Sequence, residues 1–372
     1  MNLENAVLER YTQGARQRVD ALCCPVEYDK ELLKLLPAEV IERDYGCGDP
    51  SRYVMQGDTV LDLGSGSGKV CYLAALLAGH DGEVIGVDMN DEMLTLARKY
   101  QVEMAAKVGN DRVRFVKGYI QDLALDVDAM QNWLAVNPVT DALSLGKFEH
   151  WKSLQREQSP LIASDSIDLV ISNCVLNLVD DTQKRQLVSE IYRVVKPGGR
   201  VAISDIVSDE TVPAEMKQDE KLWSGCISGA FGELEFLESF REAGFQAVCY
   251  DKWSAEPWQV VDGIEFRSVT ITAIKGEGAE CIDRGHAVIY RGPFSRIHDD
   301  DGHAFPRGQR IAVCARTFRM LTESPAYRDH FIGISPQQEP SPRPWCAPAG
   351  TLRPARETRG GVHKADPVGS CC

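Results

Sequence analysis

The stretch Thr59-Val60-Leu61-Asp62-Leu63-Gly64-Ser65-Gly66-Ser67-Gly68 places three glycines at alternate positions directly after an apolar run. Such a run is typical of a buried strand, and glycines let a ligand approach the backbone closely. A second apolar run, Glu83 to Val87, ends at Asp88, where a carboxylate can accept hydrogen bonds from both ribose hydroxyls. The order strand, glycine loop, helix and strand predicts a nucleotide-type cofactor site. The alternative without a ligand is that residues 64–68 form only a flexible turn and Asp88 is only a helix N-cap.

The glycine spacing narrows the class of cofactor. A dinucleotide loop requires a sixth-position glycine, where this chain has Lys69, or Cys71 if counting starts at Gly66. A phosphate-binding Walker loop fails at Leu63 and Val70. The spacing therefore favours the glycine-rich loop of S-adenosylmethionine methyltransferases, in which Met89 could pack on the adenine.

Composition limits the partners. The chain has 372 residues, 44% of them hydrophobic, which suits a globular protein of two or three domains. A formal charge of -14 disfavours binding to nucleic acid, and no apolar stretch is long enough to span a bilayer. We expect a cytoplasmic protein without nucleic-acid or membrane partners. The oligomeric state stays open.

Cysteine is abundant, with twelve residues in the chain. A reducing compartment argues against a disulfide framework, and the absence of any C-x-x-C pair argues against structural zinc. Buried free cysteine that packs as a small hydrophobe is the default interpretation.

Alternating apolar strands and helices predict an α/β protein with a Rossmann-like, doubly wound, mostly parallel sheet. The turn Lys196-Pro197-Gly198-Gly199 ends a helix before another strand. Strand pattern returns near Ala287 to Tyr290 and from Arg310 to Met320. The predicted organisation is a helical segment at 1–50, the cofactor-binding domain at 51–210 with an insertion at 123–164, a substrate-binding region at 211–280, a β-rich region at 281–336 and a flexible tail at 337–372.

Cysteines also occur where a cofactor would bind. Cys174 follows the strand 168–172, and ligands of open α/β sheets lie outside the carboxyl ends of strands. Asn173 could touch cofactor or substrate through its amide. Cys226 occupies a small-residue stretch that could approach a ligand closely, although its place relative to the cleft stays open. Glycines on both sides of Cys47 suit an exposed turn.

Five motifs together resemble those of the arsenite S-adenosylmethionine methyltransferases. They are Tyr45-Gly46-Cys47-Gly48, residues 62–68, Ser172-Asn173-Cys174-Val175-Leu176-Asn177-Leu178-Val179, residues 223–230 and Phe266-Arg267-Ser268-Val269-Thr270. The resemblance implies a class I methyltransferase fold, arsenite methylation and a role in arsenic detoxification. It implies that Cys174 and Cys226 bind trivalent arsenic, and that Cys47 and either Cys23 or Cys24 serve arsenic capture and a disulfide relay reduced by thioredoxin or glutathione. The implied cofactor-binding residues are Tyr45, Asp62, Gly64, Ser65, Gly66, Gly68, Asp88, Met89, Gly118, Ile120 and Asn173.

Soft thiolate ligands suit this chemistry because they hold a thiophilic guest, as carboxylates would not. Three thiolates leave the arsenic lone pair free, so positioning is the main catalytic contribution and no general base is needed. Methylation formally oxidises the arsenic, and neighbouring thiols can return two electrons by forming a disulfide.

Two features depart from the family pattern. The 123–164 insertion is longer than usual and could be a lid, a partner surface or a narrowing of the entrance. Gly225 stands where an acidic residue often precedes the second arsenic-binding cysteine.

Two alternative functions remain open. One is a methyltransferase of another small acceptor, such as a different metalloid or an organic thiol or amine, and the other is a metalloid-binding or thiol-sensing protein without turnover.

Overall fold

The computed structural model describes residues 3–19, 26–278, 280–324, 326–338, 340–345 and 347–358. The backbone divides into two compact units, Met1–Gly276 and Glu277–Cys372. The division falls just ahead of the expected start of the β-rich region at residue 281.

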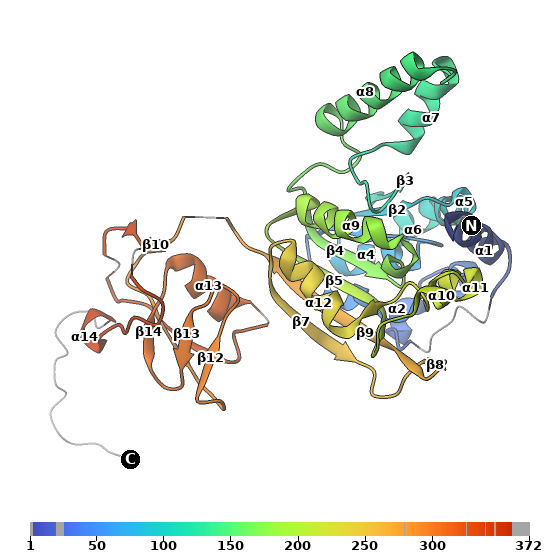
Figure 1. Ribbon diagram of the computed structural model, residues 1–372. Helices are drawn as coiled ribbons and strands as arrows, with labels where there is room; N and C mark the ends of the chain where they lie inside the picture. Colours follow the sequence, from blue (N-terminus) through green and yellow to red (C-terminus); the bar gives the residue numbers. More distant parts are fainter. Residues whose placement is uncertain are drawn as a thin grey trace. The chain divides into compact units, whose positions relative to one another are not determined.

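A mixed, mostly parallel sheet forms the centre of the first unit (Figure 1). Strands β1, β2, β3, β4 and β5 pair in parallel, and β9 and β7 continue the sheet in antiparallel orientation. The predicted substrate-binding region therefore contributes strands to the same sheet. The order is β3 (Val113–Lys117), β2 (Glu83–Asp88), β1 (Thr59–Leu63), β4 (Ile167–Asn173), β5 (Val195–Ser208), β9 (Ile264–Lys275) and β7 (Phe245–Trp253), with β6 (Phe231–Gly232) beside β5 and β8 (Gln259–Val261) beside β9.

Helices cover both faces of this sheet, which explains the nearly continuous apolar strands. Leu61 and Leu63 pack in a core with α9 (Asp181–Val194) and α12 (Glu233–Glu242). Val60 packs in the opposite core with α4 (Lys69–Ala78), α5 (Asp91–Lys99) and α6 (Gln101–Val108). The doubly wound α/β prediction is confirmed.

The remaining helices of this unit are shorter or lie outside these layers. Before β1 come α1 (Leu3–Arg16), α2 (Lys30–Leu33), α3 (Ala38–Glu42) and the 3-10 turn η2 (Pro50–Tyr53). After β4 and β5 come the 3-10 turn η3 (Leu176–Leu178), α10 (Ala214–Lys217) and α11 (Glu220–Ser224). A membrane-spanning helix is absent from the described residues, because each helix is too short or too polar to cross a bilayer.

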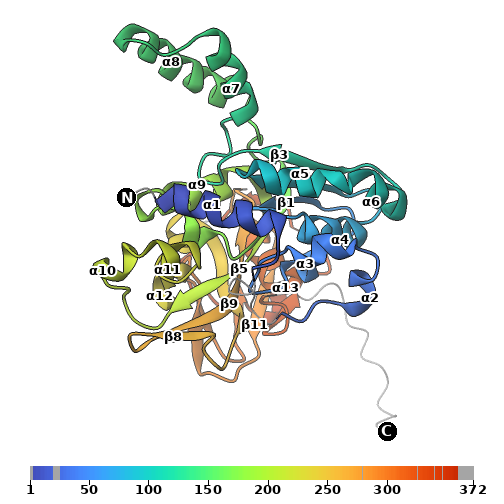
Figure 2. The ribbon, with the colours of Figure 1, turned by 90° about the vertical axis from the view of Figure 1, so that its right-hand side faces the viewer.

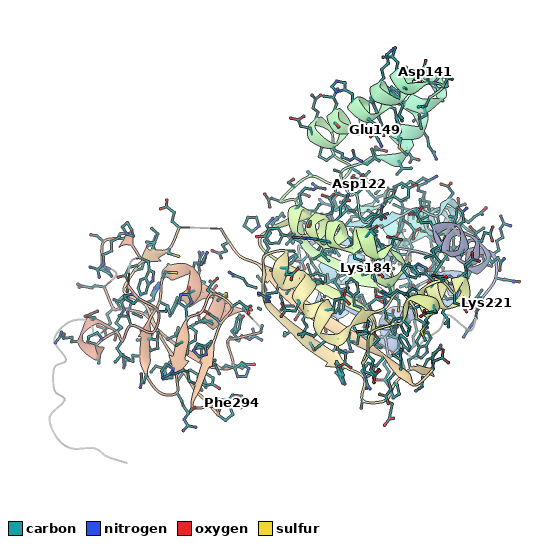
Figure 3. The ribbon with its side chains drawn as sticks, in the orientation of Figure 1. Asp122, Asp141, Glu149, Lys184, Lys221 and Phe294 are labelled. Atoms are coloured by element: carbon teal, nitrogen blue, oxygen red, sulfur yellow. The ribbon has the colours of Figure 1, made fainter. Side chains whose placement is uncertain are left out.

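The insertion forms a helical hairpin of α7 (Val127–Val136) and α8 (Ala142–Gln158) that stands off the sheet in both views (Figures 1 and 2). Trp133 stacks on Phe148 and Trp151, which joins the two helices. Asp141 caps α8 at the tip, and Asp122 marks the base (Figure 3). Val127 is the one buried residue in these two helices.

In its described residues, the second unit consists of short antiparallel strands and two helices. Its strands are β10 (Ile282–Asp283) with β16 (Arg343–Pro344), β11 (Ala287–Tyr290) between β14 (Arg310–Ala312) and β15 (Phe331–Ile334), and β12 (Arg296–His298) with β13 (Ala304–Pro306). Its helices are α13 (Ala315–Glu323) and α14 (Ala355–Thr358).

Two expectations for this unit need correction. The strand expected from Arg310 to Met320 ends at Ala312, because Cys314 caps a helix that begins at Ala315. The flexible tail expected from residue 337 includes β16 and α14. Buried Arg353 also donates to Asp283 at 2.8 Å, so these later residues pack on the unit.

Candidate functional site

A cavity opens at the carboxyl ends of β1, β2 and β4, the edge at which open α/β sheets bind ligands. Its empty volume, counted together with the open solvent at its mouth, is about 1080 Å³. We call this space the cofactor cavity.

Its floor is the glycine loop. The backbone N–H groups of Gly64 and Ser65 both donate to the Val87 carbonyl, which folds the loop back over β2. Gly66 has φ +51°, and a Cβ there would point into open space. The buried hydroxyl of Ser65 has no partner among the described residues. An open backbone beside an unsatisfied hydroxyl fits a polar ligand in this cavity.

Two carboxylates face the cavity from the strand ends. Asp88 accepts hydrogen bonds from the N–H groups of Gly66 and Asn90, both at 2.8 Å, and each oxygen keeps capacity for one more donor. Burial raises the pKa of Asp88, and these N–H groups oppose that rise. Burial also raises the pKa of Asp62 to about 8, while the Cys71 thiol donates to it at 3.2 Å.

The residues predicted to bind the cofactor gather at this cavity, with one exception. Gly68 is not among the described lining residues. Instead it is the N-cap of α4, with φ +83°, and a Cβ there would meet Phe115 and Ala97. The predicted residues that line the cavity are Tyr45, Asp62, Gly64, Ser65, Gly66, Asp88, Met89, Gly118, Ile120 and Asn173.

The sequence did not reveal that α1 covers this cavity. Glu4, Val7, Leu8 and Tyr11 all line it. The helix is fixed on both sides, because Asn90 donates to the Leu8 carbonyl and Arg10 donates to the Lys221 carbonyl of α11. The helical segment at 1–50 was predicted from the sequence, but the surface on which α1 packs was not.

A cluster of thiols adjoins the cofactor cavity. Cys174, which lines the cavity, directly follows β4, and the Cys226 thiol donates to its carbonyl at 3.2 Å. Cys47 packs in the same buried apolar cluster. We call Cys47, Cys174 and Cys226 the thiol site. Chain segments distant in sequence thus bring three sulfur side chains together beside the cavity.

Tyr11 connects α1 with the thiol site. Its hydroxyl lies 3.8 Å from the Cys226 sulfur. Burial, followed by the charges of Cys226 and Cys174, raises the pKa of Tyr11 well above its usual value. The phenol therefore stays protonated and can donate to a thiolate.

The loop that carries Cys47 is buried, so the expected exposed turn is wrong. A Cβ on Gly46 would clash with the Asn173 amide, and one on Gly48 would clash with Ser204. The glycines therefore allow close packing against β4 and β5.

Asn173 holds this loop in place. Its Oδ1 accepts from the N–H groups of Cys47 and Gly48 at 2.9 and 3.0 Å. Its Nδ2 donates to the Gly48 carbonyl and the Tyr28 hydroxyl at 2.8 and 3.0 Å. These four bonds use the usual capacity of the amide. Asn173 thus lines the cavity while its polar atoms position Cys47.

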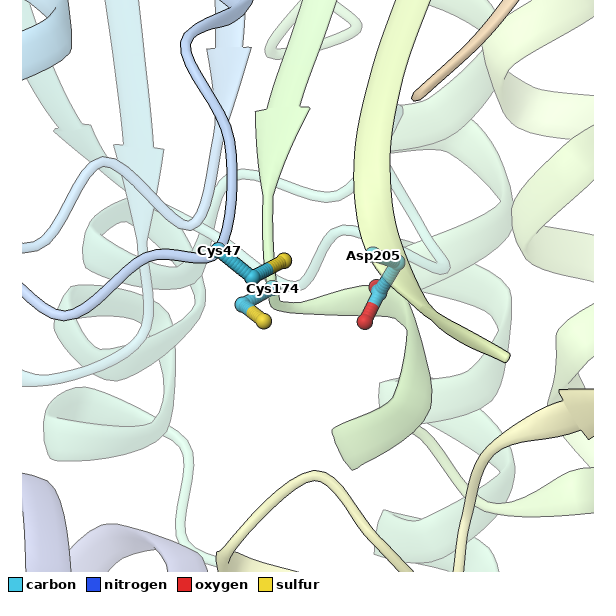
Figure 4. A group of neighbouring side chains, drawn as sticks. All are labelled: Cys47, Cys174 and Asp205. Atoms are coloured by element: carbon cyan, nitrogen blue, oxygen red, sulfur yellow. The ribbon is translucent and has the colours of Figure 1, made fainter. Parts of the chain in front are cut away.

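Asp205 completes a small group with two of the thiols (Figure 4). The sulfurs of Cys47 and Cys174 and a carboxylate oxygen of Asp205 all lie within 4.8 Å of one another. Burial raises the pKa of Asp205 to about 6, although the N–H groups of Ile206 and Leu176 oppose the rise. Sequence reasoning missed this residue, since an aspartate inside a strand gives no functional signal.

The other cysteines lie elsewhere. Cys23 and Cys24, predicted for the relay, fall outside the described residues. Cys71 is buried against Asp62, Cys249 contacts Thr272, and Cys281 and Cys314 belong to the second unit.

Comparisons with known proteins agree with this geometry. A family model described as a methyltransferase domain matches residues 55–141 and 142–244, and one for a domain of unknown function matches residues 277–363. An arsenite methyltransferase of Aquipseudomonas alcaligenes is 35% identical over 86% of both chains. The arsenite methyltransferase of Mus musculus is 30% identical over 80% of this chain and 72% of its own length.

A solved structure gives the same result. The arsenic(III) S-adenosylmethionine methyltransferase of Chlamydomonas reinhardtii superimposes with a TM-score of 0.56 at 28% identity, covering 87% of this chain and all of that one. The fold is the class I S-adenosylmethionine methyltransferase fold. On these similarities, the chain belongs to the arsenite methyltransferase family.

Proposed function

We propose that this protein transfers methyl groups from S-adenosylmethionine to trivalent arsenic held by Cys47, Cys174 and Cys226. The observation that carries the proposal is the position of Cys174, which lines the cofactor cavity and also contacts Cys226. A guest bound at the thiol site would thus lie next to the cofactor. The names of the similar proteins support arsenite as the substrate.

The cavity suits S-adenosylmethionine, which would supply an electrophilic methyl group. Asp88 is placed to accept from ribose hydroxyls, Gly66 leaves the backbone open, and the free Ser65 hydroxyl can take a polar ligand atom. Helix α1 lines the same cavity, and we expect it to exclude water from a bound cofactor. Because the Asn173 amide is engaged by the Cys47 loop, we expect it to act through Cys47.

Arsenic binding to the thiol site is a ligand exchange and requires no oxidation or reduction. Arsenite carries three hydroxyl ligands, and three thiols replace them as three As–S bonds form and three waters leave. The arsenic lone pair stays free and can accept the methyl group without loss of a proton, so the main contribution of the thiol site is positioning. Soft, polarizable thiolates are suited to such a guest.

Methyl transfer leaves arsenic formally pentavalent, and two electrons must return it to the trivalent state. We propose that two thiols supply these electrons by forming a disulfide, with Cys47 and either Cys23 or Cys24 as the pair, and that thioredoxin or glutathione then reduces it. This would support a role in arsenic detoxification. The position of Cys47 beside Cys174 supports its part in this disulfide relay.

The experiment replaces one thiol at a time. Cys226→Ser is expected to abolish arsenite methylation while cofactor binding, measured by calorimetry, stays close to wild type, because Cys226 lies outside the cavity lining. Cys174→Ser should also abolish methylation, although it can weaken cofactor binding as well. Cys249→Ser is the matched control, since that thiol contacts Thr272 away from the site.

Unchanged arsenite turnover by a folded Cys226→Ser protein would contradict the proposal. A parallel assay with selenite and with organic thiols or amines separates arsenic from the alternative acceptors.

A further inference from the structure

A carboxylate lies beside two sulfurs of the thiol site and has no part in the proposed function. The ligand atoms of Cys47, Cys174 and Asp205 all lie within 4.8 Å of one another, and all three residues are buried (Figure 4). In the part of the chain that the structure describes, no fourth His, Cys, Asp or Glu ligand atom belongs to this group. The Cys226 sulfur also lies outside it and donates to the Cys174 carbonyl at 3.2 Å. The atoms already together are therefore two sulfurs and one oxygen.

The backbone holds the Asp205 carboxylate in one orientation. Asp205 lies in β5 and is fully buried. One of its oxygens accepts the Leu176 N–H at 2.9 Å, and the other accepts the Ile206 N–H at 2.8 Å. A carboxylate has about four lone-pair sites, so these two bonds leave capacity for a cation. N–H donors also favour the ionised form that binds a cation.

The spacing of the three ligand atoms suits a divalent cation that binds sulfur. Tetrahedral zinc forms bonds of about 2.3 Å to thiolate sulfur and about 2.1 Å to carboxylate oxygen. Ligand atoms around such an ion lie about 3.6 to 3.8 Å apart, so shifts of about 1 Å bring this group to that spacing. Trivalent arsenic instead favours soft sulfur ligands alone. The oxygen ligand therefore favours a divalent cation over arsenic at this group.

Charge and access also favour a cation. Two thiolates and a carboxylate place three negative charges in a buried site, and a divalent cation offsets most of that charge. Cys174 lines the cofactor cavity, so a cation can reach the group from that space. Three protein ligands leave a fourth coordination position open, whereas structural zinc sites have four protein ligands.

We propose that Cys47, Cys174 and Asp205 form a binding site for a thiophilic divalent cation of the zinc and cadmium class. Binding is a ligand exchange without electron transfer. Two metal–sulfur bonds and one metal–oxygen bond form, three waters leave the cation, and two thiol protons pass to solvent. Because Cys47 and Cys174 are also proposed arsenic ligands, a bound cation would exclude arsenite. That consequence rests on the proposed function, whereas cation binding itself does not.

The test uses the reduced full-length protein, cadmium ions and cadmium NMR, in which the chemical shift reports the number of sulfur ligands. Each bound cadmium gives its own resonance, so the other thiols of the chain do not obscure the site. Wild type should show a resonance typical of two sulfur ligands with oxygen, and Cys47→Ser should abolish it. Asp205→Asn should weaken cadmium binding at this site roughly ten-fold or more, since removal of a group that merely orients a metal ligand already costs about that much.

Cys226→Ser is the matched variant and should keep the resonance, because that sulfur lies outside the group. Calorimetry with S-adenosylmethionine checks the fold of each variant, since Cys47, Asp205 and Cys226 are not among the described residues that line the cofactor cavity. Should Asp205→Asn fail to fold, the wild-type chemical shift and the Cys226→Ser spectrum still decide.

Three results would overturn the inference: no such resonance in wild type, unchanged affinity in Asp205→Asn, or loss of the resonance from folded Cys226→Ser. Arsenite methylation by the same proteins tests the proposed function separately. Retained turnover in Cys226→Ser would defeat the proposed function and leave the cation site in place.

Discussion

Cys174 and Cys226 share an unusual backbone conformation. Both are non-glycine residues with positive φ, +63° and +62°. This left-handed region costs a non-glycine residue on the order of 1–3 kcal/mol, and it persists only where surrounding contacts enforce it. For Cys174, one such contact is the hydrogen bond from its N–H to the Ser204 carbonyl at 2.8 Å. The two sulfurs are thus aimed by strained backbone, a feature often found at functional sites.

Buried Asp62 should make the stability of the cofactor-free protein depend on pH. Its pKa is raised from 3.8 to about 8 mainly by burial, so the folded state holds the proton more tightly than the unfolded chain. The free energy of unfolding should therefore fall as the pH rises from about 4 to about 8. One pKa unit corresponds to about 1.4 kcal/mol, so the loss is on the order of a few kcal/mol.

Asp62→Asn should flatten this dependence and make the variant more stable than wild type at pH 8.5. Chemical denaturation at several pH values measures the effect. Asp81→Asn is the control, since Asp81 is exposed. Equal slopes for Asp62→Asn and wild type would contradict the assignment.

At the scale of elements, the α7–α8 hairpin contributes little to the core. The two segments that connect it to the sheet lie side by side, because the N–H groups of Leu161 and Ile162 donate to the carbonyls of Ala124 and Leu123. Leu161 also lies against Gly118, which lines the cofactor cavity, so it belongs to the core. The helices themselves bury only Val127.

Replacement of residues 127–158 by a short glycine–serine linker should therefore leave the fold intact. We expect the cofactor dissociation constant and the kcat/KM for arsenite to stay within a few-fold of wild type. Calorimetry and a methylation assay measure these two quantities. Lost methylation with intact cofactor binding would show instead that the hairpin acts as a lid or shapes the entrance.

The elements also show how far sequence reasoning reaches. The apolar run at 59–63 and the glycines after it predicted β1, the cofactor loop and the position of Asp88, because strand order and loop chemistry are local. The stretch 214–242 does not form one continuous helix but divides into α10, α11, β6 and α12. There a Cβ on Gly229 would clash with the Asn177 carbonyl, so tertiary packing decides the local structure.

At the scale of the whole molecule, the thiol site depends on contacts between distant segments. The family motifs identified Cys47, Cys174 and Cys226, but periodicity could not show that Asn173 fixes the Cys47 loop or that α1 lines the cavity. Those features depend on side-chain contacts between residues far apart in the sequence. Cys47 and Asn173, for example, are 126 positions apart. Asp205 was invisible for the same reason.

The convergence of three sulfurs on one arsenic atom is the central claim, and anomalous diffraction at the arsenic absorption edge tests it most directly. Crystals of the full-length protein soaked with arsenite should show an arsenic peak bonded to the sulfurs of Cys47, Cys174 and Cys226, beside the cofactor cavity. A bound arsenic that avoids these sulfurs, with Cys226 turned away from Cys174, would contradict the account.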